Sequence, residues 1–179
     1  MSKNWLLVVD LDKTLWDHED ISRLKKPFKR VSEYVIEDSS GVVVRVYREL
    51  VELLKWSKER GAIVAVVSWN VEDTAINALA AAGLMDLVDY YVIEDHPRKD
   101  LMVLKLLEKL PSSESSSALN CIVYIDDNEA FLEQVRRVVE NACTIRAWID
   151  FGNYEELKNA VCKCLAKLEC RDVCNYEPG

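Results

Sequence analysis

An α/β fold with a central parallel sheet and helices on both of its faces is predicted by two features of the sequence. Five short strand-like runs alternate with five longer segments of helical period along the 179 residues. Most of the short runs are continuously apolar, which is typical of strands buried on both faces. Because a parallel strand is reached only through a crossover, this alternation indicates a three-layer, Rossmann-like sheet.

The predicted strands and helices follow one another in a regular order. The strands are residues 5–10, 62–68, 90–93, 121–125 and 143–147. The helices are residues 47–60, 71–82, 100–110, 129–141 and 154–168. In the first helix Leu50, Leu53 and Leu54 fall on one face, and Gly61 supplies a stop signal. In the third helix Val103, Leu106 and Leu107 form the apolar face.

One insertion interrupts the alternation. Residues 31–37 and 42–46 flank the turn-forming residues 38–41, which predicts a β-hairpin. It follows the first strand, so it would overhang the carboxyl edge of the sheet as a flap of about residues 17–46. Residues 111–118 are rich in serine and are predicted to form a solvated loop. We expect one domain over residues 1–179, ending in a Cys-rich helix of about residues 153–179.

Composition excludes several classes of function. Half of the residues are hydrophobic, which is enough for a sizeable core. The net charge is −8, which argues against nonspecific nucleic-acid binding, and no nucleic-acid partner is expected. No run approaches the roughly 20 apolar residues of a membrane span, and the N-terminus lacks a signal-peptide pattern. We therefore expect a cytoplasmic protein without a membrane partner.

Six cysteines are present, and four of them lie in the last 18 residues: Cys162, Cys164, Cys170 and Cys174. For a cytosolic chain, free thiols are the preferred interpretation. A disulfide that ties down the C-terminal segment comes next, and it gains weight if the source is a hyperthermophile. A metal site is the weakest alternative, because the spacing lacks the paired knuckles of zinc sites.

An acidic motif follows the first strand. Asp10 and Asp12 leave the strand two residues apart, with Thr14 two residues further on. Ligands of open parallel sheets bind at the carboxyl ends of the strands, where two such carboxylates would repel one another. A divalent cation removes that repulsion, and Mg²⁺ prefers oxygen ligands. The alternative is a polar turn in which Asp12 caps the following segment.

A second acidic pair, Asp126 and Asp127, follows the fourth strand. Alone it is equally compatible with a helix N-cap and a first-turn acid. If the fourth strand neighbours the first, the two acidic motifs converge on one site. Their agreement therefore favours a shared metal site.

Two other strand ends supply groups that bind phosphate. Ser68 ends the second strand, and Trp69 and Asn70 follow it before a helix, where a hydroxyl and free N–H groups form an anion site. Simple helix capping is the alternative. Lys99 precedes the third helix and is favoured over Arg98 and Lys105 as the cation that meets the phosphoryl group.

These motifs, in this order, resemble the haloacid dehalogenase-like (HAD) superfamily of phosphatases. The resemblance covers residues 4–147, and its most specific part is Asp10-Leu11-Asp12-Lys13-Thr14-Leu15-Trp16. The inserted hairpin and the short chain look most like the magnesium-dependent phosphatase (acid phosphatase-like) subfamily, which has a small flap in place of a large cap domain.

The resemblance implies a role for each motif. Asp10 would attack phosphorus and form an aspartyl-phosphate, and Asp12 would serve as general acid and then general base. Mg²⁺ would be held by the Asp10 carboxylate, the Asp12 carbonyl and Asp127, with Asp126 in an indirect role. Ser68 and Lys99 would hold the phosphoryl oxygens. An acid at Asp12 favours phosphate esters over the substrates of dehalogenases and phosphonatases in the superfamily.

The predicted function is a phosphomonoesterase that acts on a sugar phosphate or a phosphoprotein. Trp16, His18, Trp69 and the region of residues 28–47 would form the walls of the site, although ordinary packing is the preferred interpretation for most of them. Two alternatives remain: a phosphatase of nucleic-acid ends, and a non-catalytic binding protein that has kept the fold. The second is disfavoured because every catalytic position holds a competent residue.

Overall fold

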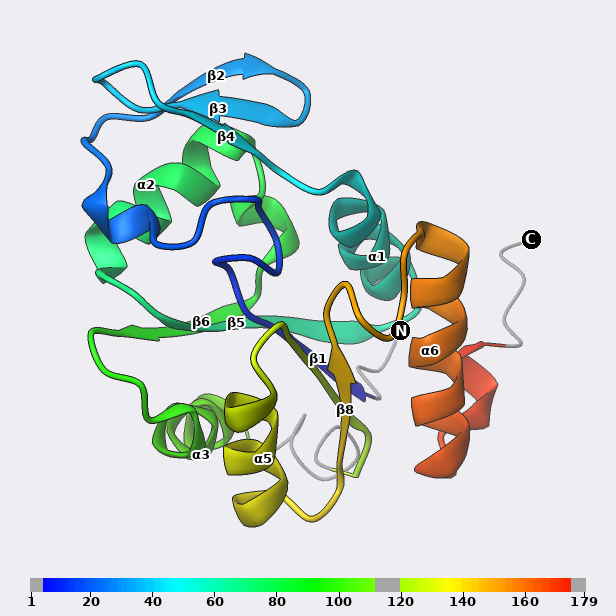
Figure 1. The fold of residues 1–179 in the computed structure, drawn as a ribbon. Helices are drawn as coiled ribbons and strands as arrows, with labels where there is room; N and C mark the ends of the chain where they lie inside the picture. The colour runs from blue at the N-terminus through cyan, green and yellow to red at the C-terminus, as the bar shows by residue number, and fades with distance from the viewer. Residues whose placement is uncertain (1–4, 112–119, 175–179) are drawn as a thin grey trace.

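The computed structural model describes residues 5–111 and 120–174. Its main element is a sheet of five parallel strands, β1 (Trp5–Val9), β5 (Ala62–Trp69), β6 (Tyr90–Glu94), β7 (Ile122–Asp126) and β8 (Ala142–Arg146). The strands lie in the order β6-β5-β1-β7-β8, so the predicted parallel sheet is confirmed (Figure 1). No helix among the described residues is long and apolar enough to cross a membrane.

The first strand occupies the centre of the sheet. All five of its residues are buried, as its uninterrupted apolar sequence predicts. It pairs with β5 on one side and with β7 on the other, where Val9 lies opposite Ile125. The two acidic motifs that follow β1 and β7 therefore leave neighbouring strands at the same edge.

Helices cover both faces of the sheet (Figure 1). One face packs against α1 (Arg48–Glu59), α2 (Glu72–Ala82) and α6 (Tyr154–Lys167), and the other packs against α3 (Lys99–Lys109) and α5 (Glu129–Val138). The side chains of β1 divide between these two cores, with Leu7 and Val9 in the first and Leu6 and Val8 in the second. The carboxyl edge of the sheet thus stands on a core that is packed from both sides.

The flap differs from the prediction in one respect. Residues 31–37 do not form one strand, because a turn at Glu33 and Tyr34 divides them. The result is a three-stranded antiparallel sheet of β2 (Lys29–Ser32), β3 (Val35–Glu37) and β4 (Val43–Arg45). The turn contains neither Gly nor Pro, so it carries no sequence signal. The guanidinium of Arg30 stabilises it by donating to the carbonyls of Ser32 and Glu33.

The predicted turn at residues 38–41 is present, and Asp38 organises it. This buried carboxylate accepts hydrogen bonds from the backbone N–H groups of Lys25, Ser40 and Val42. Gly41 follows at a φ of 93°, a conformation that favours glycine. The predicted helix of residues 129–141 ends earlier, at Val138, and β8 begins at Ala142. The predicted serine-rich loop of residues 111–118 lies outside the described residues except for Pro111.

The preferred interpretation of the cysteines was wrong. All six are paired, in the disulfides Cys121–Cys170, Cys143–Cys164 and Cys162–Cys174. The disulfide alternative holds, and it extends to two cysteines outside the C-terminal segment. One bridge joins α6 to β8, and another joins the residue before β7 to the chain after α6. The third joins α6 to the residue after the short helix Arg171–Val173.

Candidate active site

Lys99 and Asp10 form a buried ion pair at the carboxyl edge of the sheet. Asp10 follows β1 directly, and Lys99 is the first residue of α3. The Lys99 Nζ lies 2.6 Å from Asp10 Oδ1 and also donates to the carbonyl of Val67 at 2.8 Å. Burial lowers the pKa of Lys99, but the charges of Asp10 and Asp126 outweigh it and raise that pKa above the ordinary value. The ammonium group therefore stays charged.

Three carboxylates lie close together here, and two of them, those of Asp10 and Asp126, contact the ammonium group. Oxygen atoms of Asp10, Asp126 and Asp127 all lie within 4.8 Å of one another. Burial raises the pKa of Asp126 to about 7, against the opposing charge of Lys99. Burial and the charge of Asp10 also raise the pKa of Asp127. One lysine does not balance three close carboxylates, so this donor set fits a hard divalent cation.

Asp126 and Asp127 differ in how far their carboxylates are already occupied. Asp126 is fully buried and accepts hydrogen bonds from the Tyr124 hydroxyl and the Asn128 N–H, besides its contact with Lys99. Asp127 is half-buried and accepts one long hydrogen bond of 3.4 Å from the Thr14 hydroxyl. Asp127 therefore has more lone pairs left for a cation than Asp126 has, and its role as the direct ligand stays a prediction.

Asp12 is held apart from this cluster. Its carboxylate accepts hydrogen bonds from Trp16 Nε1 at 2.7 Å, Asn70 Nδ2 at 2.8 Å and the Ile21 N–H at 3.3 Å. Lys13, the next residue, has a φ of 59°, so the chain reverses direction immediately after Asp12. Burial raises the pKa of Asp12 to about 7, even though the Trp16 hydrogen bond lowers it. A carboxyl with that pKa is able to donate and accept a proton near neutral pH.

Three consecutive residues at the end of β5 have different surroundings. Ser68 is fully buried, and its hydroxyl has no hydrogen-bond partner among the described residues, which fits an acceptor such as a phosphate oxygen. Asn70 is also buried, but its amide binds Asp12 and its N–H binds the Glu94 carbonyl. The Trp69 side chain remains 47% exposed.

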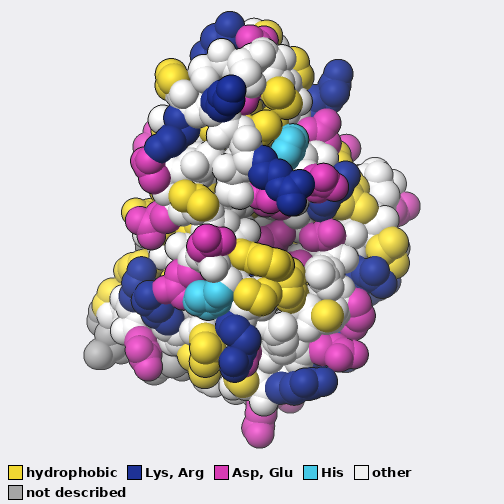
Figure 2. Space-filling model, turned by 60° about the vertical axis from the view of Figure 1, so that its left-hand side comes forward, with side chains coloured by type: hydrophobic (Ala, Val, Ile, Leu, Met, Phe, Trp, Pro, Cys, Tyr) yellow, Lys and Arg dark blue, Asp and Glu magenta, His cyan; other side chains and the backbone are white. Residues whose placement is uncertain are grey.

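The predicted wall residues have different contacts. Trp16 is buried, and its indole N–H donates to the Asp12 carboxylate. His18 accepts a hydrogen bond from the Asp20 N–H at Nδ1. A cavity of about 370 Å³ opens beside Asp12. It is lined by Asp12, Glu19, Asp20, Ser22, Arg23, Trp69, Asn70 and Asp95. Figure 2 shows a face of the molecule on which hydrophobic side chains lie among acidic ones.

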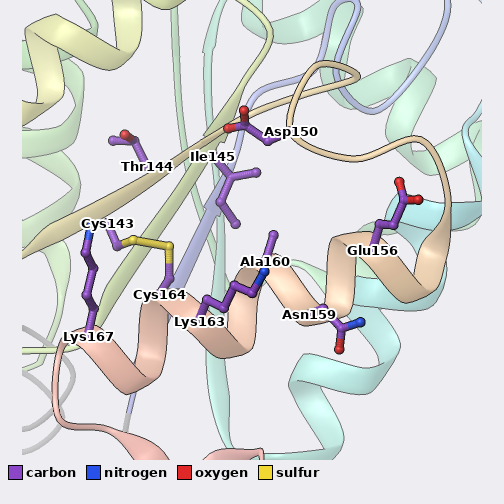
Figure 3. A pocket seen from close by; sticks show the side chains of 10 residues that line it. All are labelled: Cys143, Thr144, Ile145, Asp150, Glu156, Asn159, Ala160, Lys163, Cys164 and Lys167. Atoms are coloured by element: carbon purple, nitrogen blue, oxygen red, sulfur yellow. A yellow bond between two sulfur atoms is a disulfide. The ribbon is translucent and has the colours of Figure 1, made fainter.

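A larger cavity, of about 610 Å³, lies elsewhere. It is formed by β8 and α6, and its wall includes the disulfide between Cys143 and Cys164 (Figure 3). None of the strand-end carboxylates lines it. The chemistry of the donor groups, rather than cavity size, therefore places the candidate active site at the carboxyl edge.

Several contacts at the site were not predicted. Asn70 was expected to bind phosphate, and in the structure its side-chain amide donates to Asp12. Tyr124, which donates to Asp126, was not named from the sequence. The Arg146 Nε donates to the Asp127 carbonyl at 3.2 Å, and the Trp148 Nε1 donates to the Thr14 carbonyl at 3.3 Å. A polar side chain in a buried strand, such as that of Tyr124, was the available signal, because a buried hydroxyl needs a partner.

Comparison with solved structures shows the fold. A HAD-superfamily hydrolase from Ehrlichia chaffeensis aligns with a TM-score of 0.62 and 14% identity, over 92% of this chain and 99% of that one. The HAD domain of the effector protein Lem4 from Legionella pneumophila aligns with a TM-score of 0.60 and 12% identity, over 92% and 97% of the two chains. Identities this low carry no information about activity.

Sequence comparison adds a relative and a family. Human magnesium-dependent phosphatase 1 is 36% identical over 87 residues, which are 49% of this chain and 48% of that protein. The match thus spans about half the length of the human relative. The family model described as Acid Phosphatase matches residues 4–129, a range that holds the motifs at Asp10, Ser68, Lys99 and Asp126. The chain belongs to this acid phosphatase family within the HAD fold.

Proposed function

We propose that the chain is a magnesium-dependent phosphomonoesterase that works through an aspartyl-phosphate on Asp10. The observation that carries this proposal is the convergence of strand-end groups: Lys99 Nζ lies 2.6 Å from Asp10 Oδ1, and the carboxylates of Asp126 and Asp127 complete the cluster. The family membership and the name of the human relative support the same reaction class.

The residues present fit a Mg²⁺ ion. The Asp10 carboxylate, the Asp12 carbonyl and the Asp127 carboxylate would hold it, while Asp126 would act on it indirectly. The bound ion would offset the negative charge of the phosphoryl group and of its attacking carboxylate. This role agrees with the excess of carboxylates over ammonium groups at the cluster.

Asp10 and Asp12 would then divide the reaction between them. A carboxylate oxygen of Asp10 attacks phosphorus, the bond from phosphorus to the ester oxygen breaks, and Asp12 gives its proton to the departing alcohol. In the second step Asp12 takes a proton from water, whose oxygen attacks phosphorus. The bond to Asp10 breaks, and inorganic phosphate leaves.

Lys99 and Ser68 would hold the phosphoryl oxygens throughout. Lys99 already contacts the nucleophile, and the Ser68 hydroxyl has no hydrogen-bond partner among the described residues. In this proposal Asn70 serves Asp12, because its amide is hydrogen-bonded there. Trp69 is left for contact with the rest of the substrate. The substrate would be a phosphorylated small molecule, such as a sugar phosphate, or a phosphoprotein.

The test is hydrolysis of para-nitrophenyl phosphate with Mg²⁺, with EDTA, and in an Asp10→Asn variant. We expect Mg²⁺-dependent release that falls roughly 10⁴-fold or more in the variant, because the nucleophile is lost. Asp86→Asn, at an exposed aspartate, is the matched control and should keep full activity. Ordinary turnover by Asp10→Asn would contradict the nucleophile assignment.

A further inference from the structure

Trp69 is exposed where its neighbours are buried. It is the last residue of β5, and its side chain is 47% exposed, while those of Ser68 and Asn70 on either side are 0% and 2% exposed. A large aromatic side chain left in solvent beside buried catalytic groups loses the free energy of its own burial. An apolar surface in such a position is therefore available for a ligand.

The indole of Trp69 packs against Phe131, which also lies near Lys99. Its ring lies edge-on to that of Phe131 in α5, with centroids 6.4 Å apart and an interplanar angle of 75°. The ammonium group of Lys99 lies 5.4 Å from the centroid of the same Phe131 ring. Edge-to-face pairs are favourable, so the orientation of Trp69 is coupled to the lysine that meets the phosphoryl group.

The cavity beside Trp69 lies on the leaving-group side of the proposed reaction. Asp12 lines it together with Trp69, and Asp12 is the residue that would protonate the leaving oxygen. A volume of about 370 Å³ accommodates a small ring. The group bonded to the ester oxygen would therefore fill this cavity and meet the exposed indole.

The charges around the cavity restrict that group further. Glu19, Asp20 and Asp95 line it, and the guanidinium of Arg23 is already paired with Asp20 at 2.9 Å. A second anionic group on the substrate would face these three carboxylates, against a single guanidinium among the residues that line the cavity. A neutral group avoids this repulsion.

We propose that Trp69 is the specificity-determining residue for the leaving group, and that the preferred substrates are phosphomonoesters whose leaving group is a ring with a flat apolar face and no second negative charge. This inference rests on the proposed function, since it assigns the cavity through the role of Asp12. Trp69 stacks on the ring, and Phe131 holds the indole in the stacking orientation.

Three alkyl phosphates with similar leaving-group chemistry test the proposal: benzyl, n-butyl and 4-carboxybenzyl phosphate. We expect kcat/KM for benzyl phosphate to exceed that for each of the others about tenfold. Trp69→Ala should lower the benzyl value about tenfold, mainly through KM, and change the butyl value less than about twofold. Trp69→Phe should restore most of the loss.

Val71→Ala is the matched control, because Val71 is 40% exposed two residues away and does not line the cavity. It should leave the benzyl preference unchanged. Equal losses on benzyl and butyl phosphate in Trp69→Ala would overturn the proposal, since they would indicate a general structural effect. So would equal turnover of benzyl and 4-carboxybenzyl phosphate by the unaltered protein.

Binding separates this inference from the proposed function. Benzyl phosphate is titrated calorimetrically into Asp10→Asn and into Asp10→Asn with Trp69→Ala, both with Mg²⁺. A Kd about tenfold higher in the variant without the indole supports the inference, whether or not the unaltered protein hydrolyses any ester. A failure to hydrolyse any ester would refute only the proposed function. Equal Kd values would overturn the inference even if hydrolysis is observed.

Discussion

The part of the chain that matches the family model and the C-terminal part are stabilised in different ways. Residues up to 129 contain the strand-end motifs, and at their centre the ammonium group of Lys99 pairs with two buried carboxylates. The part from β8 onward carries five of the six disulfide-bonded cysteines and the wall of the larger cavity. The first part therefore depends on charge balance at one site, whereas the second depends on covalent links.

The two parts meet beside the site. Arg146 and Trp148 reach back to the carbonyls of Asp127 and Thr14, so the C-terminal part holds the backbone on which the acidic motifs stand. Up to residue 174, where the described part of the chain ends, it adds no His, Cys, Asp or Glu to the cluster of Asp10, Asp126 and Asp127. The comparison implies that changes in the first part alter both rate and stability, while changes to the disulfides alter stability alone.

The largest effect on stability is expected at Lys99. Lys99→Met leaves Asp10 and Asp126 buried without their cation, and breaking such a pair costs about 3–5 kcal/mol of unfolding free energy. Urea denaturation in EDTA measures it. Lys105→Met, in the same helix but with an exposed ion pair to Glu94, should cost less than about 1 kcal/mol. Equal effects of the two variants would mean that the buried charge does not stabilise the fold.

The site was predictable to the extent that its signals are local. Buried strands and the acids that follow them are visible in sequence, and the adjacency of β1 and β7 then brings Asp10 and Asp126 together. The sequence favoured Lys99 over Arg98 and Lys105 but did not single it out, because burial distinguishes these cations and the sequence does not show which of them is buried. Lys99 is fully buried, whereas Arg98 is exposed and pairs with Asp100.

Features that depend on contacts between distant segments were not predictable. The hydrogen bond from Asn70 to Asp12 joins residues 58 positions apart, and no local pattern marks it. The pairing of the cysteines depends on how α6 lies against β8, which the spacing of the cysteines does not encode.

The disulfides bear on the expected cytoplasmic location. Disulfides persist in oxidising compartments and in the intracellular proteins of hyperthermophiles, so a cytoplasmic location would imply a hyperthermophilic source.

Removing a disulfide tests the second half of the comparison. Replacing both Cys121 and Cys170 with Ala opens the link with the longest sequence separation, 49 residues. We expect a loss of about 2–4 kcal/mol in unfolding free energy, and a smaller loss for the Cys162 and Cys174 pair, whose separation is 12 residues.

Turnover at 25 °C should stay within about twofold in both double variants, because no disulfide contacts the carboxylate cluster. Thermal unfolding and the initial rate of para-nitrophenyl phosphate hydrolysis are measured on the same samples. A large loss of rate without a loss of stability would place the C-terminal part in the catalytic machinery and remove the distinction between the two parts.

The smallest effect is expected in the flap, which is stabilised by a single carboxylate, that of Asp38, rather than by a buried ion pair or a disulfide. Burial alone would raise the pKa of Asp38, but hydrogen bonds from Lys25, Val42 and Ser40 outweigh it and lower the pKa to about 2. Asp38→Ala leaves those donors without their acceptor and should cost about 2 kcal/mol at neutral pH.

The pH dependence gives the sign of this contribution. Because the pKa of Asp38 is lower in the folded protein than its ordinary value of 3.8, its stabilisation is fully present above about pH 4 and is lost as the pH falls toward 2. The difference in unfolding free energy between the unaltered protein and Asp38→Ala should therefore shrink between pH 5 and pH 2.5. A difference that stays constant over this range would mean that the ionised carboxylate does not hold the turn, and that residues 38–41 fold through their backbone alone.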